Sequence, residues 1–179
     1  MTEQTTQKKY ELLKDDTVEH FGRTLYRIKA LITFGLVGAG QLGGYIETEK
    51  NLDHSGNAWV YDNALVYGDA RVYGNACVYD NALVYGDARV YGNARVFGNA
   101  WVRSLAVISE RKMIFWASNV GSENGTLTVS NGKFGLIVTR GCFTGTVDEF
   151  LSKSKEVHDD KTHHEYKLLI EVAQSRILN

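Results

Sequence analysis

The chain has 179 residues, enough for one or two small domains with a core that needs no disulfide or metal to hold it together. Its 20 basic and 21 acidic residues almost cancel, so no overall charge attracts nucleic acid or an anionic membrane, and neither is expected as a partner. Proline is absent, which suits a chain dominated by backbone ladders that use every N–H group.

The cellular compartment is inferred from the hydropathy pattern and the cysteines. Residues 1–16 contain no apolar run, and no later stretch approaches the roughly 20 apolar residues of a membrane span. Cys77 and Cys142 lie in different regions, which favours two reduced thiols over a disulfide framework. We therefore expect a soluble, cytoplasmic protein, in the host bacterial cytosol if it is phage-encoded.

Residues 1–35 are predicted to form an N-terminal hairpin. The segments YELL and TLYRIKA have the composition and alternation of strands, and the polar stretch DDTVEHFGR connects them. The repeats that follow have a terminal strand edge to hide, and the hairpin is expected to cover that edge as a cap. His20, in the connection, is interpreted as a solvated turn residue.

The middle of the chain repeats every six residues. A valine recurs at this interval and an alanine precedes each valine by two positions, so every unit contains A-x-V. This alternation points both side chains to one face of a short strand, and the Gly-Asn, Gly-Asp or Asp-Asn pair between units tolerates turn dihedrals. The valines are Val60, Val66, Val72, Val78, Val84, Val90, Val96 and Val102.

A longer period of 18 residues overlies the short one. YDNALVYGDARVYGNACV, residues 61–78, is followed by the same sequence at residues 79–96 with one change, from Cys77 to Arg95. Three units of strand and corner close a triangular coil of this length, and successive coils stack about 4.8 Å apart. The single change lies on an outward column, where the core does not dictate the residue.

VYGNAC, VYDNAL and VYGDAR resemble the hexapeptide repeat of left-handed parallel β-helices, which occur in acyltransferases and in non-enzymatic relatives. The resemblance covers residues 56–103 and implies a mainly β, left-handed solenoid. LVGAGQLGGYIETEKNLDHSGNAWV is similar to the degenerate first coil of a family of bacterial and phage hypothetical proteins. Residues 36–103 are therefore assigned to the β-helix, with residues 36–55 capping it.

The period sorts outward side chains into columns. Leu65, Leu83 and Trp101 form an apolar column that needs a cover, and because relatives with this helix are commonly trimers, we expect a homotrimer interface there. Arg71 and Arg89 are interpreted as a surface ion-pair ladder with the neighbouring Asp69 and Asp87, or alternatively as ligands for an anion between subunits. Aromatic corner residues form further columns, which are expected to stack: Tyr61, Tyr79 and Phe97; Tyr67 and Tyr85; Tyr73 and Tyr91.

Residues 104–179 are predicted to form a small α+β domain, because the six-residue rhythm stops after Arg103. MIFWA, GTLTVS and KFGLIVT indicate strands, and Asn131-Gly132 is a two-residue hairpin signal. Capping boxes at Thr146 and Thr162 indicate two helices. Tyr166, Leu169, Ile170, Ala173 and Ile177 give the last helix an apolar stripe. The region resembles a C-terminal module that recurs in phage-encoded proteins.

A candidate anion site lies in RGCFTGT, between the last expected strand and the first helix. Glycines and a helix N-terminus favour an anion, and basic or hydroxyl side chains add donors. The alternative is an ordinary strand-to-helix turn in which Thr146 only caps the helix. The candidate residues are Arg140, Gly141, Thr144, Gly145 and Thr146, with Asn119 and Ser122 from an adjoining polar loop.

The favoured function is a non-catalytic binding protein for a small anionic, nucleotide-like ligand or a host protein, which it sequesters to counter a host defence. The first alternative is a CoA-dependent acyltransferase, for which His54, in a valine position of the degenerate coil, is the one candidate base. The second is a structural spacer or self-assembling rod. Without the acyltransferase reading, no cofactor is expected, and no metal site is expected under any reading.

Overall fold

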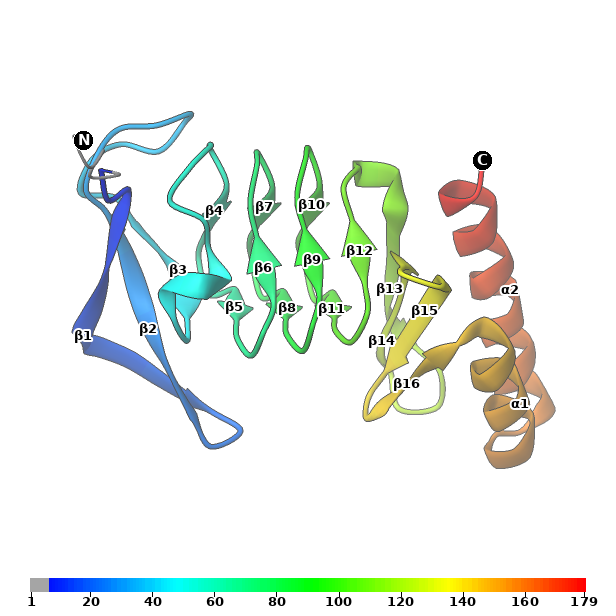
Figure 1. The fold of residues 1–179 in the computed structure, drawn as a ribbon. Helices are drawn as coiled ribbons and strands as arrows, with labels where there is room; N and C mark the ends of the chain where they lie inside the picture. The colour runs from blue at the N-terminus through cyan, green and yellow to red at the C-terminus, as the bar shows by residue number, and fades with distance from the viewer. Residues whose placement is uncertain (1–6) are drawn as a thin grey trace.

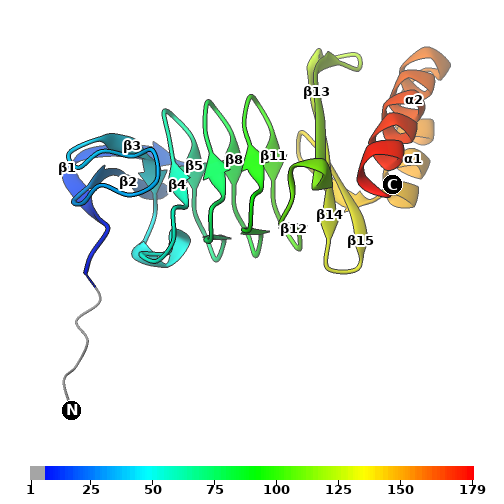
Figure 2. The same cartoon turned by 90° about the horizontal axis from the view of Figure 1, so that it is seen from above.

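The computed structural model describes residues 7–179, which form three parts in succession along one axis. A β-hairpin stands at the N-terminal end, a stack of coils forms the middle, and a four-stranded sheet with two helices closes the C-terminal end (Figure 1). The view from above shows the coils between the hairpin and the sheet (Figure 2). The predicted mainly β fold, with a triangular solenoid and a small α+β unit, is confirmed.

Each side of a coil carries a two-residue strand. The strands are β4 (Trp59–Val60), β5 (Leu65–Val66), β6 (Arg71–Val72), β7 (Cys77–Val78), β8 (Leu83–Val84), β9 (Arg89–Val90), β10 (Arg95–Val96), β11 (Trp101–Val102) and β12 (Val107–Ile108). Strands one coil apart pair in parallel, which gives the three faces β4-β7-β10, β5-β8-β11 and β6-β9-β12. The 18-residue period is therefore the length of one coil, as the duplicated sequence predicts.

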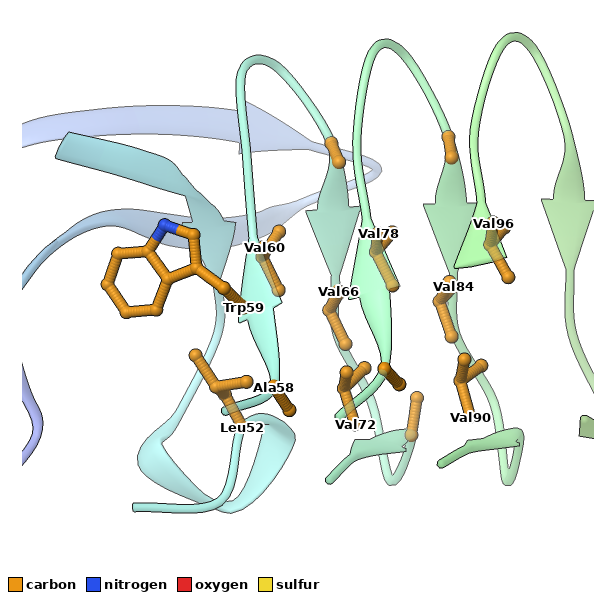
Figure 3. Packing of buried hydrophobic residues seen from close by; sticks show 14 of the residues in the cluster. Leu52, Ala58, Trp59, Val60, Val66, Val72, Val78, Val84, Val90 and Val96 are labelled. Atoms are coloured by element: carbon orange, nitrogen blue, oxygen red, sulfur yellow. The ribbon is translucent and has the colours of Figure 1, made fainter. Parts of the chain in front are cut away.

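Alanine and valine side chains fill the interior of the solenoid. Those of the A-x-V units are at most 1% exposed, and Figure 3 shows the valines of successive coils lying beside one another along the axis. Each A-x-V strand directs a small and a medium-sized side chain inward, so three strands meet around the axis at the density of a protein core. Identical coils stack because each one presents the same inward surface to the next.

The corners need a backbone conformation with positive φ, which the repeat provides through glycine and aspartate. Asp62 and Asp80 have φ of 53° and 58°, and Gly98 follows in the same column at 63°. The Asp80 carboxylate accepts a hydrogen bond from the Gly98 N–H at 3.0 Å, and aspartate is among the few side chains that enter this conformation readily. Predicted ring stacks are present beside these corners, with centroids 4.9 Å apart for Tyr67 and Tyr85, 4.8 Å for Tyr73 and Tyr91, and 4.8 Å for Tyr79 and Phe97. Tyr61 does not stack as predicted, because its ring meets Tyr79 edge-on at 6.5 Å.

The solenoid continues one side beyond Arg103, where the rhythm was expected to stop. Ala106-Val107-Ile108 is a further unit of the A-x-V kind, and β12 pairs with β9 as the earlier strands pair. Isoleucine replaces valine at the inward position, and Ile108 is fully buried. A pattern based on valine alone misses this unit.

The first coil contains two extra residues. Ile46 lies opposite Val66 and Leu52 opposite Val72, a separation of 20 positions instead of 18. The short helix η1 (Glu49–Asn51) lies between Ile46 and Leu52, and the two extra residues follow Leu52, because Val60 again lies 18 positions before its partner Val78. Leu52 occupies the inward position that the sequence assigned to His54. His54 instead belongs to the loop that carries the extra residues.

The N-terminal hairpin consists of β1 (Tyr10–His20) and β2 (Arg23–Ala30), and β2 pairs with β3 (Leu42–Ile46) at the start of the solenoid. The connection between the strands is shorter than predicted, because DDTVEH belongs to strand β1. The pairing of β1 with β2 shifts register between Leu13 and Thr17, which accommodates these residues. His20 is therefore a half-buried strand residue and not a solvated one. Its Nε2 has no hydrogen-bond partner among residues 7–179, and burial lowers the pKa of its imidazole.

The C-terminal unit is an antiparallel sheet of β13 (Ile114–Val120), β14 (Gly125–Gly132), β15 (Gly135–Arg140) and β16 (Phe143–Thr146), preceded by the short helix η2 (Arg111–Met113). Helices α1 (Val147–Val157) and α2 (Asp160–Ile177) pack on this sheet around a second core. The predicted stripe on α2 faces that core, with four of its five residues buried. Neither helix is long and apolar enough to cross a membrane.

Two predicted signals in this unit are displaced. The hairpin turn is Lys133-Phe134, because Gly132 pairs with Gly135 inside the ladder. A side chain at Gly132 would lie 2.5 Å from Ile137, so close packing explains this glycine. Helix α2 begins at Asp160, where Asp159 caps it by accepting from the Thr162 N–H at 2.8 Å. The capping box at Thr146 is present as predicted.

Candidate functional site

The RGCFTGT segment does not form the predicted turn from a strand into a helix. Gly141 and Cys142 make a two-residue β-hairpin turn, and residues 143–146 continue as strand β16 before α1 begins. The predicted glycine-rich loop is therefore split between a hairpin tip and an edge strand. A continuous anion cradle at the helix N-terminus is not present.

The polar groups of this segment are engaged within the chain. Arg140 donates from Nε to the Tyr166 hydroxyl at 3.0 Å and lies 3.7 Å from the Glu123 carboxylate. Thr144 accepts from the Arg103 guanidinium, and Thr146 caps α1. Gly145 has no space for a side chain beside Glu149 and Phe143. These contacts favour the alternative structural interpretation of the segment.

The polar loop between β13 and β14 reaches the predicted site through one residue only. Glu123 lies in a depression with Arg140 and Gly141, whereas Asn119 and Ser122 are exposed and do not line it. Asn119 has a positive φ of 60°, which accounts for an asparagine where strand β13 becomes irregular. The structure therefore does not bring the predicted binding residues together.

Arg71 and Arg89 lie on a different face of the molecule. They line a depression of about 400 Å³ with Lys50 and His54, beside Glu49 and Asp53. Within residues 7–179, no ion pair joins either arginine to Asp69 or Asp87, so the predicted ion-pair ladder is wrong. The arginines extend from the strand face, whereas the aspartates line a separate cleft at the corner.

His54 is held in one tautomer by the cap. Its Nδ1 accepts the Lys9 backbone N–H at 3.1 Å, and Nε2 lies 3.2 Å from the Glu49 carboxylate. Its ring stacks on Tyr10 with centroids 4.2 Å apart. A general base needs a nitrogen lone pair that can reach a substrate, and the lone pair of neutral His54 is occupied. The geometry gives His54 the role of joining the hairpin to the first coil.

The predicted interface column is in register. Leu65, Leu83 and Trp101 lie opposite one another on β5, β8 and β11, and Tyr45 precedes them on β3. All four side chains are half-buried. Trp101 also faces the C-terminal unit, where its backbone N–H donates to Thr128 at 3.0 Å.

The strongest candidate site is a groove between the solenoid and the C-terminal unit, which we call the arginine groove. It has a volume of about 400 Å³ and contains three guanidinium groups from three different elements. Arg95 projects from β10, Arg111 from η2 and Arg176 from the last turn of α2. The remaining lining residues are Tyr79, Phe97, Ile114, Phe115 and Trp116.

Aromatic rings form the other wall of the arginine groove. Tyr79 and Phe97 stack with centroids 4.8 Å apart, and the Trp116 ring meets Phe97 edge-on at 4.5 Å. The corner ladder of the solenoid therefore continues onto strand β13. The result is an aromatic wall beside a cationic one, an arrangement suited to a ligand that carries both a planar ring and a negative charge.

None of the three groove arginines forms an ion pair or a side-chain hydrogen bond within the part of the chain that the structure describes. Among residues 7–179, no carboxylate lines the groove. Arg95 and Arg111 also act on the neighbouring Cys77: burial raises the pKa of its thiol, and these two guanidiniums partly oppose the rise. The groove is thus an unneutralised cationic surface, to which an anion is attracted.

The sequence contains one signal for this groove, at Arg95. Arg95 is the one residue that distinguishes the second copy of the 18-residue coil from the first. The repeat pattern alone predicts only that an outward position is free to vary. The structure shows that Arg95, unlike Cys77, lines the groove. Arg111 and Arg176 carry no comparable signal, because their approach depends on how the C-terminal unit packs.

Comparison with known protein families supports the repeat architecture. A family model described as the YdcK beta solenoid repeat matches residues 58–74, 64–79, 70–86 and 88–104. No curated protein matches the sequence. The matched segments lie within the coils and leave out the hairpin and the C-terminal unit, so they concern the scaffold only. The chain is a β-solenoid repeat protein whose repeats are similar to those of the YdcK type.

Proposed function

We propose that the protein binds a small anionic, nucleotide-like ligand in the arginine groove and does not transform it. The observation that carries this proposal is the convergence of Arg95, Arg111 and Arg176, all without partners within residues 7–179, on one aromatic-lined groove. A guanidinium recognises phosphate or carboxylate through paired N–H donors. The groove volume of about 400 Å³ lies within the usual range for small-molecule sites.

The aromatic wall supports a ligand with a planar group. Phe97 is 36% exposed and Trp116 is half-buried, so part of each ring remains available to a base or similar ring. Stacking on such rings contributes about 1–3 kcal/mol per base in nucleic-acid complexes. A nucleotide satisfies both walls at once, because its phosphate and its base lie on opposite sides of a sugar.

The assembly and biological context are part of the same proposal. A homotrimer that covers Leu65, Leu83 and Trp101 would place three arginine grooves on one particle. Such a particle is suited to sequestering a ligand, which is the role expected if the protein is phage-encoded and counters a host defence. The acyltransferase alternative gains no support from His54, whose two ring nitrogens are held by Lys9 and Glu49.

The test uses three probes that separate the two walls: adenosine 5′-monophosphate, adenosine and ribose 5-phosphate. The chain has three tryptophans, and Trp116 lies in the groove while Trp59 is fully buried in the core. Their indole N–H signals can be followed by NMR during a titration. We expect adenosine 5′-monophosphate to move the Trp116 signal at the lowest concentration, with adenosine and ribose 5-phosphate each weaker.

The variants Arg95→Gln, Arg111→Gln and Arg176→Gln should each weaken binding about tenfold, or about 1.4 kcal/mol. Arg71→Gln and Arg89→Gln are the matched controls, because these exposed arginines lie on another face of the same solenoid. Binding should also weaken as salt is raised. If the control variants lose as much affinity as the groove variants, the binding depends on the overall charge of the protein and not on the groove. An unmoved Trp116 signal with all three probes would exclude the proposed site.

A further inference from the structure

A second cleft lies at another corner of the solenoid, and we call it the hairpin cleft. Two β-hairpin tips border it: Phe21-Gly22 at the end of β1 and Gly141-Cys142 at the end of β15. In Figure 1 both tips extend past the coils on the side of β5, β8 and β11. The cleft has a volume of about 650 Å³, and the stacked rings of Tyr67 and Tyr85 lie between the two tips.

The available charge in this cleft is negative. Arg23 is paired with Glu47 at 2.9 Å. Arg103 is held by Thr144, the Tyr85 hydroxyl and the Cys142 carbonyl. The charge of Arg23 is therefore paired, whereas Arg103 keeps its charge because its three partners are neutral. With Asp69 and Asp87 in the lining, the cleft has a net charge of −1, counting Arg23 and Glu47 as a neutral pair.

Asp69 and Asp87 line the same cleft and form no ion pair or side-chain hydrogen bond with any residue in the described range 7–179. They occupy equivalent positions one coil apart, so the two carboxylates repel each other across neighbouring rungs of the stack. A cation placed at this rim would relieve that repulsion.

Phe21 is a residue that folding alone does not explain. It is 83% exposed and has a φ of 46° in a two-residue turn, with Gly22 at 74°. Turns of this kind favour asparagine or aspartate at the first position, and a bulky residue there is strained. Strain and exposure of an aromatic ring over a cleft together indicate a binding role. Trp101, half-buried, supplies a second ring that faces the cleft.

We propose that the hairpin cleft binds a lysine or arginine side chain of a partner protein, presented by a segment with apolar neighbours. The rings of Phe21 and Trp101 contact the methylenes and the apolar neighbours, and Asp69 and Asp87 take the positive charge. An aromatic wall beside carboxylates favours a cation over an anion. This site is independent of the arginine groove, which has the opposite charge and lies at a different corner. It shares Trp101 with the proposed homotrimer face, so the partner segment and a second subunit compete for this residue.

The experiment uses a capped peptide, acetyl-Ala-Leu-Lys-Leu-Ala-amide, and two matched peptides with norleucine or glutamate in place of lysine. Trp101 in the cleft is the reporter, and the Trp116 and Trp59 signals of the same spectrum are internal references. The lysine peptide should move the Trp101 indole signal and leave the other two in place. The norleucine peptide should bind at least fivefold more weakly, and the glutamate peptide should not bind.

Two variants test the walls of the cleft separately. Asp69→Asn with Asp87→Asn should weaken the lysine peptide at least fivefold and leave the norleucine peptide unchanged. Phe21→Asn should weaken both peptides while the melting temperature is maintained or raised, because asparagine suits the turn. Phe134→Asn is the matched control, since Phe134 is equally exposed, at 82%, in a hairpin turn outside the cleft.

Several outcomes would overturn the proposal. These are an unmoved Trp101 signal, equal affinity for the lysine and norleucine peptides, or equal effects of Phe21→Asn and Phe134→Asn. The fourth is a Trp101 signal that changes with protein concentration alone, together with an increase in particle mass on sedimentation. That result would assign the cleft to a second copy of the chain.

Discussion

The arginine groove and the hairpin cleft are built on the same plan and have opposite chemistry. Each lies at a corner of the solenoid, uses a stacked pair of rings from that corner as one wall, and is bordered by the C-terminal unit. The groove contains three guanidiniums without partners in the described chain. The cleft contains two carboxylates that also lack partners there, and one guanidinium, that of Arg103, which is hydrogen-bonded to neutral groups only. The scaffold is shared, and the charge is not.

The difference lies in where the charged residues come from. Asp69 and Asp87 belong to the repeat itself, so the negative charge of the cleft comes from equivalent positions in two successive coils. Arg95 is the one difference between the two copies of the 18-residue coil, and Arg111 and Arg176 lie outside the repeat. Stacked coils therefore supply regular aromatic walls, and a distinct binding chemistry arises where the repetition is broken or ends.

The largest expected effect concerns the core that supports both sites. Val84→Ala removes two methyl groups from a fully buried position in a central coil and leaves a cavity, which should lower the free energy of unfolding by about 2 kcal/mol. Urea denaturation followed by circular dichroism measures the change. Arg89→Ala is the control, because its exposed side chain should change stability by less than about 0.5 kcal/mol. Equal losses would contradict the packing shown for the coils.

The next prediction concerns the cap, which carries the Phe21 wall of the hairpin cleft and no part of the arginine groove. Lys9 is 1% exposed and donates to the Ala58 carbonyl at 2.8 Å, and burial lowers the pKa of its ammonium to about 8. Below pH 8 the lysine is protonated in both the folded and the unfolded protein. Between pH 8 and its ordinary pKa of about 10.4, the unfolded chain binds more protons, so stability should rise with pH.

The rise should have a slope of at most about 1.4 kcal/mol per pH unit. It is best measured by denaturation between pH 8 and 9.5, roughly the interval below tyrosine ionisation. The Cys77 thiol, whose pKa burial raises, opposes the rise in this interval, and the comparison with Lys9→Met isolates the lysine contribution. Above that interval the sign reverses, because burial raises the pKa of Tyr10, and unfolding then releases a proton. Lys9→Met should abolish the rise. A slope that persists in this variant would assign it to another group.

The sequence predicted the scaffold well because each repeat unit meets the same surroundings. Spacing alone placed Val66 and Val84 inside and stacked Tyr67 on Tyr85, since neighbouring coils impose identical local geometry. The errors begin where copies stop being identical. His54 was misplaced because two extra residues enter the first coil, and the unit at Ile108 was missed because isoleucine replaces valine.

The candidate sites could not be predicted to the same extent. The groove depends on the distance between Arg95 and Arg176, residues 81 positions apart whose approach is set by how α2 packs on its sheet. RGCFTGT has the composition of an anion loop, yet Arg103 and Glu149 satisfy its hydroxyl and backbone groups. Hydrogen bonds from side chains that are distant in the sequence cannot be predicted from a local sequence pattern.

A smaller effect on stability should separate the groove from the coil beneath it. Arg95→Cys restores the residue that occupies the same position one coil earlier, so the unfolding free energy should change by less than about 0.5 kcal/mol. Binding of adenosine 5′-monophosphate should nevertheless weaken about tenfold. Denaturation and titration of the same variant measure both. A loss of stability comparable to that of Val84→Ala would mean that Arg95 belongs to the fold.

A modest gain in stability tests the other side of the comparison. At Phe21 the backbone has a φ of 46°, a conformation that asparagine enters at lower cost than phenylalanine. Phe21→Asn should therefore raise the free energy of unfolding by up to about 1 kcal/mol, offset in part by the lost edge contact with His20 at 4.6 Å. Thermal denaturation beside Phe134→Asn measures the gain. A destabilised Phe21→Asn would make the ring part of the hairpin's packing, whereas a stabilised one indicates that phenylalanine is kept at this turn for what it contacts outside the chain.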